Sequence, residues 1–151
     1  FGSRPPLVGF ASEGQKHSAA FVEETGEFVC NIVTEDLWHA MNATSASLPR
    51  GHNEMSHANL TAAPSRLVSP PRVAEAVAAL ECVWTETVHL KDAQGQPTSS
   101  YLVCGEVVGI HIDDRFILRG KVDAAAMRIM ARMGYMDYLV TERTVSLQRP
   151  V

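Results

Sequence analysis

The apolar and polar residues of this chain follow two different periods. Alternating and β-branched runs, which are typical of strands, cover several segments. The expected strands are Leu7–Ala11, Glu27–Val33, Ala79–Lys91, Ser100–Asp113 and Tyr138–Leu147. Apolar residues spaced three or four positions apart indicate helices between them. The expected helices are Ser18–Glu24, Thr34–Ala43, a short one near Asn53–Ala58, and Asp123–Met133.

Capping residues mark the ends of these helices. Ser18 is expected to be the N-cap of the first helix, and Gly26 to stop it. Thr34 is expected to cap the second helix, and Asp123 the last, which Gly134 would end.

Apolar stripes are expected to hold two of the helices against the core. In the second helix the stripe consists of Leu37, Trp38 and Met41. In the last helix it consists of Met127, Met130 and Ala131.

Between these elements lie one long loop and one short turn. Residues 45–71 are rich in Pro, Ser, Asn, His and Ala, and loops of this length are either functional lids or mobile. The polar turn at residues 92–97 joins the two longest expected strands. A hairpin of that length usually curls into a barrel wall.

Composition places the chain among soluble, single-domain proteins. It has 151 residues, of which 46% are hydrophobic and 20% charged, and its formal net charge is −4. No apolar run could cross a bilayer, and no basic footprint suggests nucleic-acid binding. Cys30, Cys82 and Cys104 lie in strand-like runs without metal-ligand spacing, which favours reduced thiols and a cytoplasmic location.

The segment Pro5–Ser18 is the most informative part of the chain. A short apolar strand leads through a glycine turn to Lys16, His17 and Ser18 at the start of a helix. An ammonium group, a hydroxyl group and a helix N-terminus together suit a phosphate. The alternative is an ordinary capped helix with a solvated lysine.

Three polar residues at the end of the second helix form another candidate cluster. Asn42, Thr44 and Ser45 could bind the edge of a ligand, or they could satisfy the last helix carbonyls.

A single histidine near the end of a long strand is the candidate catalytic residue. Val103, Gly105, Val107, Gly109 and His111 share one face, since strand residues alternate between faces. The two glycines are expected to leave room for a flat ligand. The alternative is that the histidine is only a hydrogen-bonded structural residue.

The motifs of several common enzyme classes are missing from the sequence. It contains no GxGxxG turn after a strand, no GxSxG elbow, no HExxH and no Walker loop. His52, Glu54 and His57 lie in the polar loop without a supporting metal pattern, and Asp113 and Asp114 are interpreted as turn residues.

Taken together, these segments resemble the flavin reductase-like, FMN-binding split-barrel family. The resemblance rests on Pro5–Ser18, Met41–Ser45, Gly105–Asp113 and Arg132–Tyr138, in that order. In the last segment Tyr135 replaces the family's usual second glycine. The resemblance implies a mainly β fold with flanking helices, a Greek-key split β-barrel. Residues 1–151 would form one such domain, lacking the family's N-terminal segment.

The resemblance also implies roles for individual residues. Lys16 and Ser18 match the family's phosphate position, with His17 between them, and Ser12 lies where a strand end approaches the flavin. His111 would position or polarise a group near the flavin and nicotinamide. The remaining cofactor-binding residues implied are Asn42, Thr44, Ser45 and Tyr138, the last of which would either stack at the pocket or fill the barrel end.

The implied activity is that of an FMN-dependent NAD(P)H:flavin oxidoreductase. FMN would be the flavin, with FAD as an alternative that exchanges, and NADH or NADPH the reductant. The expected partners are a second copy of the chain and a monooxygenase that accepts reduced flavin, with no nucleic acid or membrane. The alternative function is a flavin-binding electron carrier or cofactor-binding module without its own turnover. A barrel that has lost its cofactor is a third possibility.

Overall fold

The computed structural model describes residues 1–14, 16–148 and 150. Strands predominate, and the chain divides into two compact units, which are described in turn. The strands are β1 (Gly2–Ser3), β2 (Pro6–Glu13), β3 (Glu27–Asn31), β4 (Ala62–Ala63), β5 (Arg72–Val73), β6 (Ala78–Lys91), β7 (Pro97–Ile112), β8 (Ile117–Leu118), β9 (Lys121–Val122), β10 (Met130–Gly134) and β11 (Asp137–Val140). The helices are α1 (His17–Thr25), α2 (Trp38–Ala43) and α3 (Glu54–His57), with 3₁₀ turns at η1 (Glu35–Leu37) and η2 (Asp114–Phe116).

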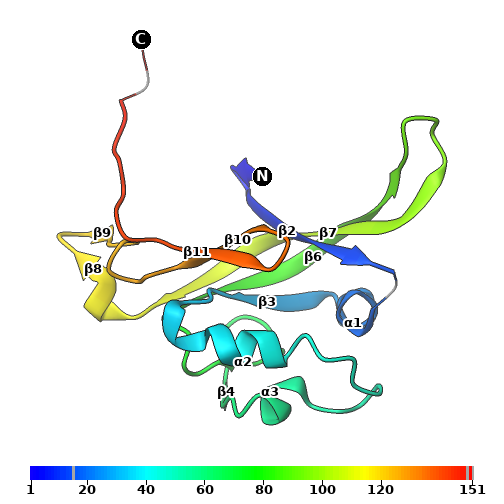
Figure 1. Ribbon diagram of the computed structural model, residues 1–151, viewed down its shortest axis with the longest axis horizontal. Coiled ribbons are helices and arrows are strands. Elements are labelled where there is room, and N and C mark those ends of the chain that lie inside the picture. The colour runs from blue at the N-terminus through cyan, green and yellow to red at the C-terminus, as the bar shows by residue number, and fades with distance from the viewer. Residues whose placement is uncertain (15, 149, 151) are drawn as a thin grey trace. The chain divides into compact units, whose positions relative to one another are not determined.

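The first unit contains residues 1–30, 62–72 and 79–110. Most of the five-stranded sheet lies in it, in the order β1-β2-β7-β6-β3. β2 pairs with β7 in antiparallel register from Leu7 opposite Glu106 to Glu13 opposite Ser100. The β6–β7 hairpin therefore continues past the end of β2, as Figure 1 shows. Its expected polar turn is confirmed, and Asp92 Oδ1 accepts hydrogen bonds from the N–H groups of Gln94 and Gln96.

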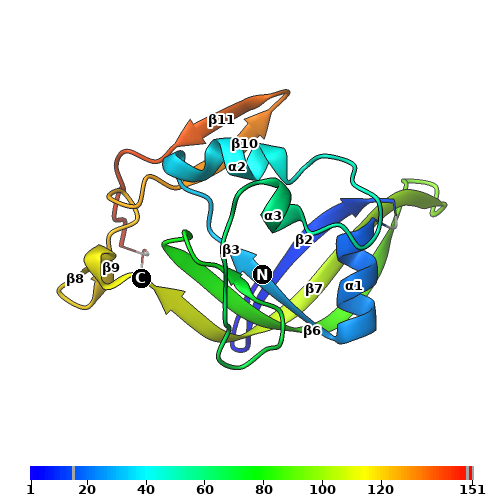
Figure 2. The same ribbon diagram turned by 90° about the horizontal axis from the view of Figure 1, so that it is seen from below.

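One face of the sheet and one face of α1 form the core of this unit, and Figure 2 shows α1 alongside the sheet. The buried residues are Ala19, Val22, Phe28, Cys82, Val103 and Val107. Phe10 packs edge-on against Phe28, with ring centroids 5.7 Å apart. The alternation predicted for β7 is confirmed, because Val103, Gly105 and Val107 are all buried.

The glycines of β7 do not leave an open slot, so that expectation is wrong. A Cβ atom at Gly105 would lie 2.5 Å from Cε1 of Phe28. One at Gly109 would lie 3.3 Å from the side chain of Glu81. Both glycines admit neighbouring side chains of the protein itself, so the space beside them is already filled.

Glu81 is a fully buried carboxylate in the first unit. Its Oε1 atom accepts a hydrogen bond from the N–H of Arg66 at 2.8 Å. Its Oε2 atom accepts from the N–H groups of Leu67 at 2.6 Å and Val68 at 3.2 Å. Glu27 also accepts from the N–H of Ser69 at 2.8 Å. The long loop is thus fixed at residues 66–69, because carboxylates on β6 and β3 bind its backbone.

The second unit contains residues 31–61, 73–78 and 111–151. Backbone contacts between segments far apart in the sequence hold it together. Thr34 and Ile129 form an isolated antiparallel bridge, and the N–H of Met130 donates to the carbonyl of Val33 at 2.9 Å. The short helix expected in the long loop is confirmed as α3, where Asn53 Oδ1 accepts from the N–H of Ser56.

The helix expected over Asp123–Met133 is wrong. Asp123 does cap a single turn, because its Oδ1 accepts from the N–H of Ala126 at 3.0 Å. Arg128 then takes a φ of 51°, which ends any helix, and the chain continues as β10. β10 pairs with β11, so the closing strand covers Asp137–Val140 and not Tyr138–Leu147. Pairing between β10 and β11 therefore determines the secondary structure here. Met127 is buried, as expected.

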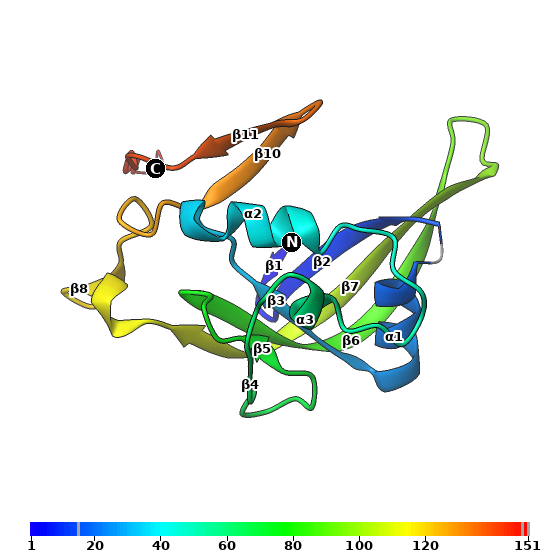
Figure 3. The same ribbon diagram turned by 60° about the horizontal axis from the view of Figure 1, so that its bottom comes forward.

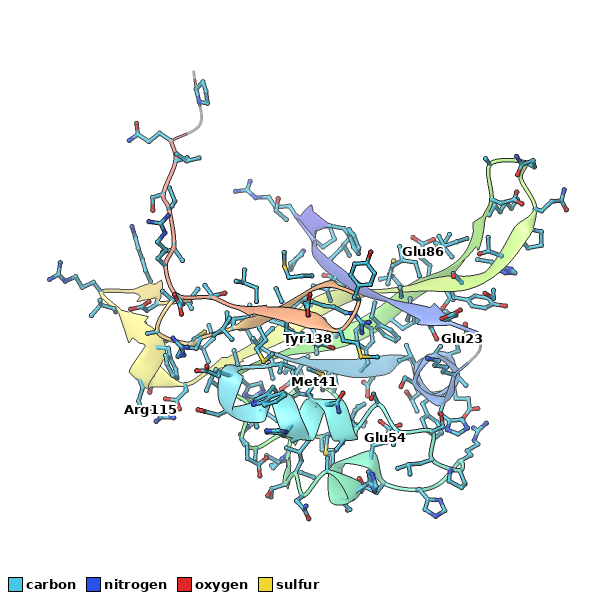
Figure 4. All side chains as sticks on the ribbon, viewed as in Figure 1. Glu23, Met41, Glu54, Glu86, Arg115 and Tyr138 are labelled. Carbon is cyan, nitrogen blue, oxygen red and sulfur yellow. The ribbon has the colours of Figure 1, made fainter. Side chains whose placement is uncertain are left out.

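Replacing Glu81 with Gln is expected to lower the free energy of unfolding by about 3 kcal/mol, because an amide NH₂ would face backbone N–H donors and leave buried groups unpaired. Urea unfolding followed by circular dichroism measures this effect. The matched control is Glu86→Gln, since Glu86 lies exposed on the same strand (Figure 4). Equal midpoints for the two variants would show that the three hydrogen bonds contribute little.

Candidate functional site

The start of α1 is the first part of the candidate site. The helix begins at His17, and its N-cap is Lys16, so the expectation that Ser18 is the N-cap is wrong. The Lys16 side chain makes no capping hydrogen bond, and the first turn holds no acidic residue. The first N–H to bond within the helix is that of Ala20, which donates to the carbonyl of Lys16 at 3.1 Å. The preceding N–H groups therefore face outward from the helix end.

The polar side chains here differ in exposure. Lys16 and Ser18 are exposed, and His17 is half-buried with its ring 6.2 Å from that of Phe21. Ser12 is buried at the end of β2, where its hydroxyl donates to the carbonyl of Gly14 at 2.8 Å. The structure thus groups Lys16 and Ser18 with the first N–H groups of the helix, an arrangement that favours an anion.

The other predicted site residues belong to the second unit. The Thr44 hydroxyl donates to the carbonyl of Met41 at 2.7 Å, and the Ser45 hydroxyl donates to that of Asn42 at 2.6 Å. Both hydroxyl groups therefore satisfy carbonyls at the end of α2, and only their lone pairs remain to accept from a ligand. Asn42 itself is exposed. His111 is half-buried near the end of β7.

A cavity of about 280 Å³ lies beneath α2 and α3. Its walls are mainly apolar, and Figure 4 labels Met41 and Glu54 on these two helices. The lining residues are Asn31, Ile32, Val33, Leu37, Ala40, Met41, Thr44, Glu54, Met55, Leu60, Val73 and Ala76. Thr44 is the one predicted site residue among them.

A wider groove of about 490 Å³ lies between α2 and the β10–β11 hairpin, which are side by side in Figure 3. Tyr138 lines it, together with Trp38, Met136 and other residues. Trp38 is 46% exposed, so its predicted place in a buried stripe is wrong. Helical spacing groups Trp38 with Leu37 and Met41. The spacing cannot show that Trp38 lines a groove, because the other wall of that groove is a hairpin about ninety residues later in the sequence.

Two carboxylates of the second unit, Glu35 at the groove and Asp113 at the start of η2, have arginine partners. A bidentate ion pair joins Glu35 to Arg128, and the hydrogen bond from Arg128 holds the pKa of Glu35 below its ordinary value. The pKa of Asp113 is lowered likewise, by its hydrogen bonds from Arg115. Asp113 caps η2, which confirms it as a turn residue. Among the described residues, no group of His, Cys, Asp or Glu could hold a metal ion.

Two of the three cysteines interact inside the first unit. Cys82 is fully buried on β6, and Cys30 is partly buried on β3. A hydrogen bond from Cys82 lowers the pKa of the Cys30 thiol, whereas the pKa of Cys82 is raised by that bond and by burial. All three cysteines are free thiols in strands, as the sequence predicts.

Residues 1–122 match the family model of the flavin reductase like domain. The chain belongs to this family. An uncharacterised protein of Halalkalibacterium halodurans is 34% identical over 98% of this chain and 73% of its own length.

Solved structures agree with the family and show the split-barrel fold. Nitrilotriacetate monooxygenase component B from Bacillus cereus is 28% identical, with a TM-score of 0.89 over 97% of this chain and 74% of that one. The FMN-binding domain of a flavin reductases-like enzyme from Shewanella baltica is 18% identical, with a TM-score of 0.78 over 98% of this chain and 77% of that one. The expected mainly β, split-barrel fold is therefore confirmed.

In this flavin reductase-like chain, the β10–β11 turn keeps a left-handed backbone where the family's second glycine is replaced. Tyr135 has a φ of 50° and is 95% exposed. Arg132 Nη2 donates to the Tyr135 carbonyl at 3.0 Å, and the guanidinium lies 5.9 Å from the ring centroid of Tyr138. The turn therefore holds Tyr138 at the groove although a tyrosine, and not a glycine, takes the left-handed position.

Replacing Arg128 with Met is expected to remove a pH-dependent part of the stability. Since the pKa of Glu35 is lowered in the folded state, the ion pair stabilises the protein above the unfolded pKa of about 4.3 and is lost as the pH falls through the folded value. The variant should unfold more easily than the parent at pH 7 but equally at acidic pH. Both groups are exposed, so the difference should be small and should shrink in salt.

Thermal unfolding at several pH values measures this difference. The control is Arg143→Met, which removes an exposed arginine from the segment that follows β11. A difference between Arg128→Met and the parent that stays constant from neutral to acidic pH would contradict the assignment.

Proposed function

We propose that this protein is an NAD(P)H-dependent oxidoreductase of the flavin reductase type that binds FMN. The start of α1 is the observation that carries the proposal. Exposed Lys16 and Ser18 lie beside the first N–H groups of the helix, with no acid in the first turn to repel an anion. This donor set fits the phosphate of FMN. The Shewanella baltica domain, which is described as FMN-binding, supports the same cofactor.

Each residue has a limited task in this proposal. Lys16 supplies a point charge to the phosphate, Ser18 donates its hydroxyl, and buried Ser12 holds the turn before the helix. In the second unit, Thr44 and Ser45 keep lone pairs that can accept hydrogen bonds, and Asn42 can donate or accept. The bound flavin would supply hydride and electron transfer.

His111 is proposed as a positioning residue for the nicotinamide and not as an obligatory proton donor. A half-buried imidazole can hold a carboxamide by a hydrogen bond in either tautomer. The reduced flavin would pass to an acceptor. Similarity to a monooxygenase component favours a monooxygenase in that role.

The proposal predicts that added FMN binds and is bleached by reduced nicotinamide. Anaerobic absorption spectra of the protein with FMN, followed by NADH or NADPH, test both steps and identify the donor. Bound flavin that stays yellow would favour an electron carrier without its own turnover. Protein that binds no flavin would overturn the proposal.

A substitution separates phosphate binding from ring binding in the same experiment. Lys16→Ala should weaken FMN binding by roughly tenfold, because it removes a charge-assisted contact to phosphate. Riboflavin, which lacks the phosphate, should bind both proteins equally. Lys91→Ala is the control, since Lys91 is an exposed lysine at the end of β6. Equal loss of FMN and riboflavin would indicate general damage to the fold.

We also propose that two copies of the chain associate through the outer face of the β10–β11 hairpin. Residues opposite each other in an antiparallel pair share a face. Ala131 is opposite Leu139, and Met133 lies at the register shift that follows on β10. Met133 is 66% exposed and Leu139 is 54% exposed, although both are apolar. An exposed apolar face of this kind marks an interaction surface.

The double variant Met133→Glu, Leu139→Glu is therefore expected to be monomeric where the parent is dimeric, because like charges would face each other across the interface. Size-exclusion chromatography with light scattering measures the mass. Val145→Glu, at an exposed apolar residue outside the hairpin, is the control. A parent protein that is monomeric, or a double variant that stays dimeric, would exclude this face.

A further inference from the structure

The groove between α2 and the β10–β11 hairpin has the composition of a site for a flat aromatic ring. Its lining residues, all in the second unit, are Glu35, Trp38, Met130, Met136, Asp137, Tyr138 and Val140. At about 490 Å³ it lies within the range of small-ligand sites.

The aromatic side chains of the groove come from elements far apart in the sequence. Trp38 begins α2, and Tyr138 lies on β11, labelled in Figure 4 beside the helix. The two rings are partly exposed, at 46% and 38%. His39 stacks on Trp38 with ring centroids 3.6 Å apart, which restricts the indole orientation. Met130 and Met136 add polarisable thioethers, which bind well to aromatic rings.

One face of the hairpin turns toward this groove at Met130, Tyr138 and Val140, and Asp137 also lines it beyond the register shift between Arg132 and Gly134. Met130 is opposite Val140, and Arg132 is opposite Tyr138, so these residues share one face. The outer face, with Ala131 and Leu139, is the opposite one. The groove and the proposed dimer face are therefore separate surfaces of one hairpin.

The acidic residues that line the groove favour a group that donates hydrogen bonds. Of the lining residues, two are carboxylates and none is basic. Nearby Arg128 is engaged with Glu35, and Arg132 donates to the Tyr135 carbonyl. Asp137 is exposed at the rim, where its carboxylate can accept from an amino group.

We infer that this groove binds the adenine of the nicotinamide dinucleotide, an inference that rests on the proposed function. Adenine is flat and uncharged at neutral pH, and its exocyclic amino group would donate to Asp137 while the ring stacks on Trp38 and Tyr138. The groove then fixes the non-reacting end of the reductant.

Intrinsic fluorescence of Trp38 gives a direct test without flavin or turnover. The chain has two tryptophans, so Trp84→Phe leaves Trp38 as the only one. Adenosine should change its emission in a saturable way. Trp38→Phe, which keeps only Trp84, should show no change. The parent, which keeps both tryptophans, should respond, so the test does not depend on the folding of the Trp84 variant.

Two further comparisons test the chemistry of recognition. Tyr138→Leu should weaken adenosine binding by about tenfold or more, as expected for loss of a base-stacking ring. Tyr135→Leu, at the exposed turn, should leave it unchanged. Inosine has a carbonyl in place of the amino group, so the parent should bind inosine more weakly than adenosine. The Asp137→Asn variant should not show this preference for adenosine.

The outcomes separate this inference from the proposed function. Saturable binding of riboflavin but not of adenosine would assign the groove to a flavin ring and overturn the inference. Emission of Trp38 that no nucleoside changes would overturn it as well, as would equal binding by the Tyr138 and Tyr135 variants. Failure of the anaerobic bleaching experiment bears on the proposed function alone, because adenosine carries no redox chemistry.

Discussion

Close packing at Gly105 is the constraint on which the first unit depends. The ring of Phe28 occupies the space that any side chain at this position would need, with a 2.5 Å approach to an ideal Cβ. That contact joins β3 and β7, which flank β6 in the sheet, in one core, which Val103, Cys82 and two residues of α1 complete. Because protein interiors are packed as densely as crystals, this arrangement has little freedom to adjust.

A second constraint is the way the structure uses buried polar groups. Glu81 lies under Gly109 and binds three consecutive backbone N–H groups of a loop that has almost no secondary structure. A loop rich in proline and serine cannot satisfy its own backbone, so a carboxylate from the sheet does it instead. The position of the loop is therefore set by the sheet and not by its own sequence.

The sequence predicted those elements whose signals are local. The long hairpin has alternating residues and a polar turn, α1 has Gly26 at its end, and α3 has Asn53 as its cap. It failed at residues 123–140, where Arg128 and Tyr135 take positive φ values that L residues seldom adopt. The bridge between Thr34 and Ile129 holds the chain beside Arg128, and the β10–β11 pairing holds the turn at Tyr135.

The candidate site likewise has one part that the sequence could predict and one part that it could not. Lys16 and Ser18 are neighbours in sequence, so their association with a helix start was predictable. The opposition of Trp38 and Tyr138, a hundred residues apart, was not, because it depends on where the hairpin packs.

Tyr135 shows how the hairpin turn tolerates a change in its chemistry. A left-handed residue other than glycine costs about 1 kcal/mol or more in backbone strain. Glycine avoids that strain, but it gives the unfolded chain more conformations to lose on folding, which offsets part of the difference. Tyrosine at this position therefore costs the turn some stability. Pairing between β10 and β11 compensates for that cost, so the strand that carries Tyr138 keeps its place.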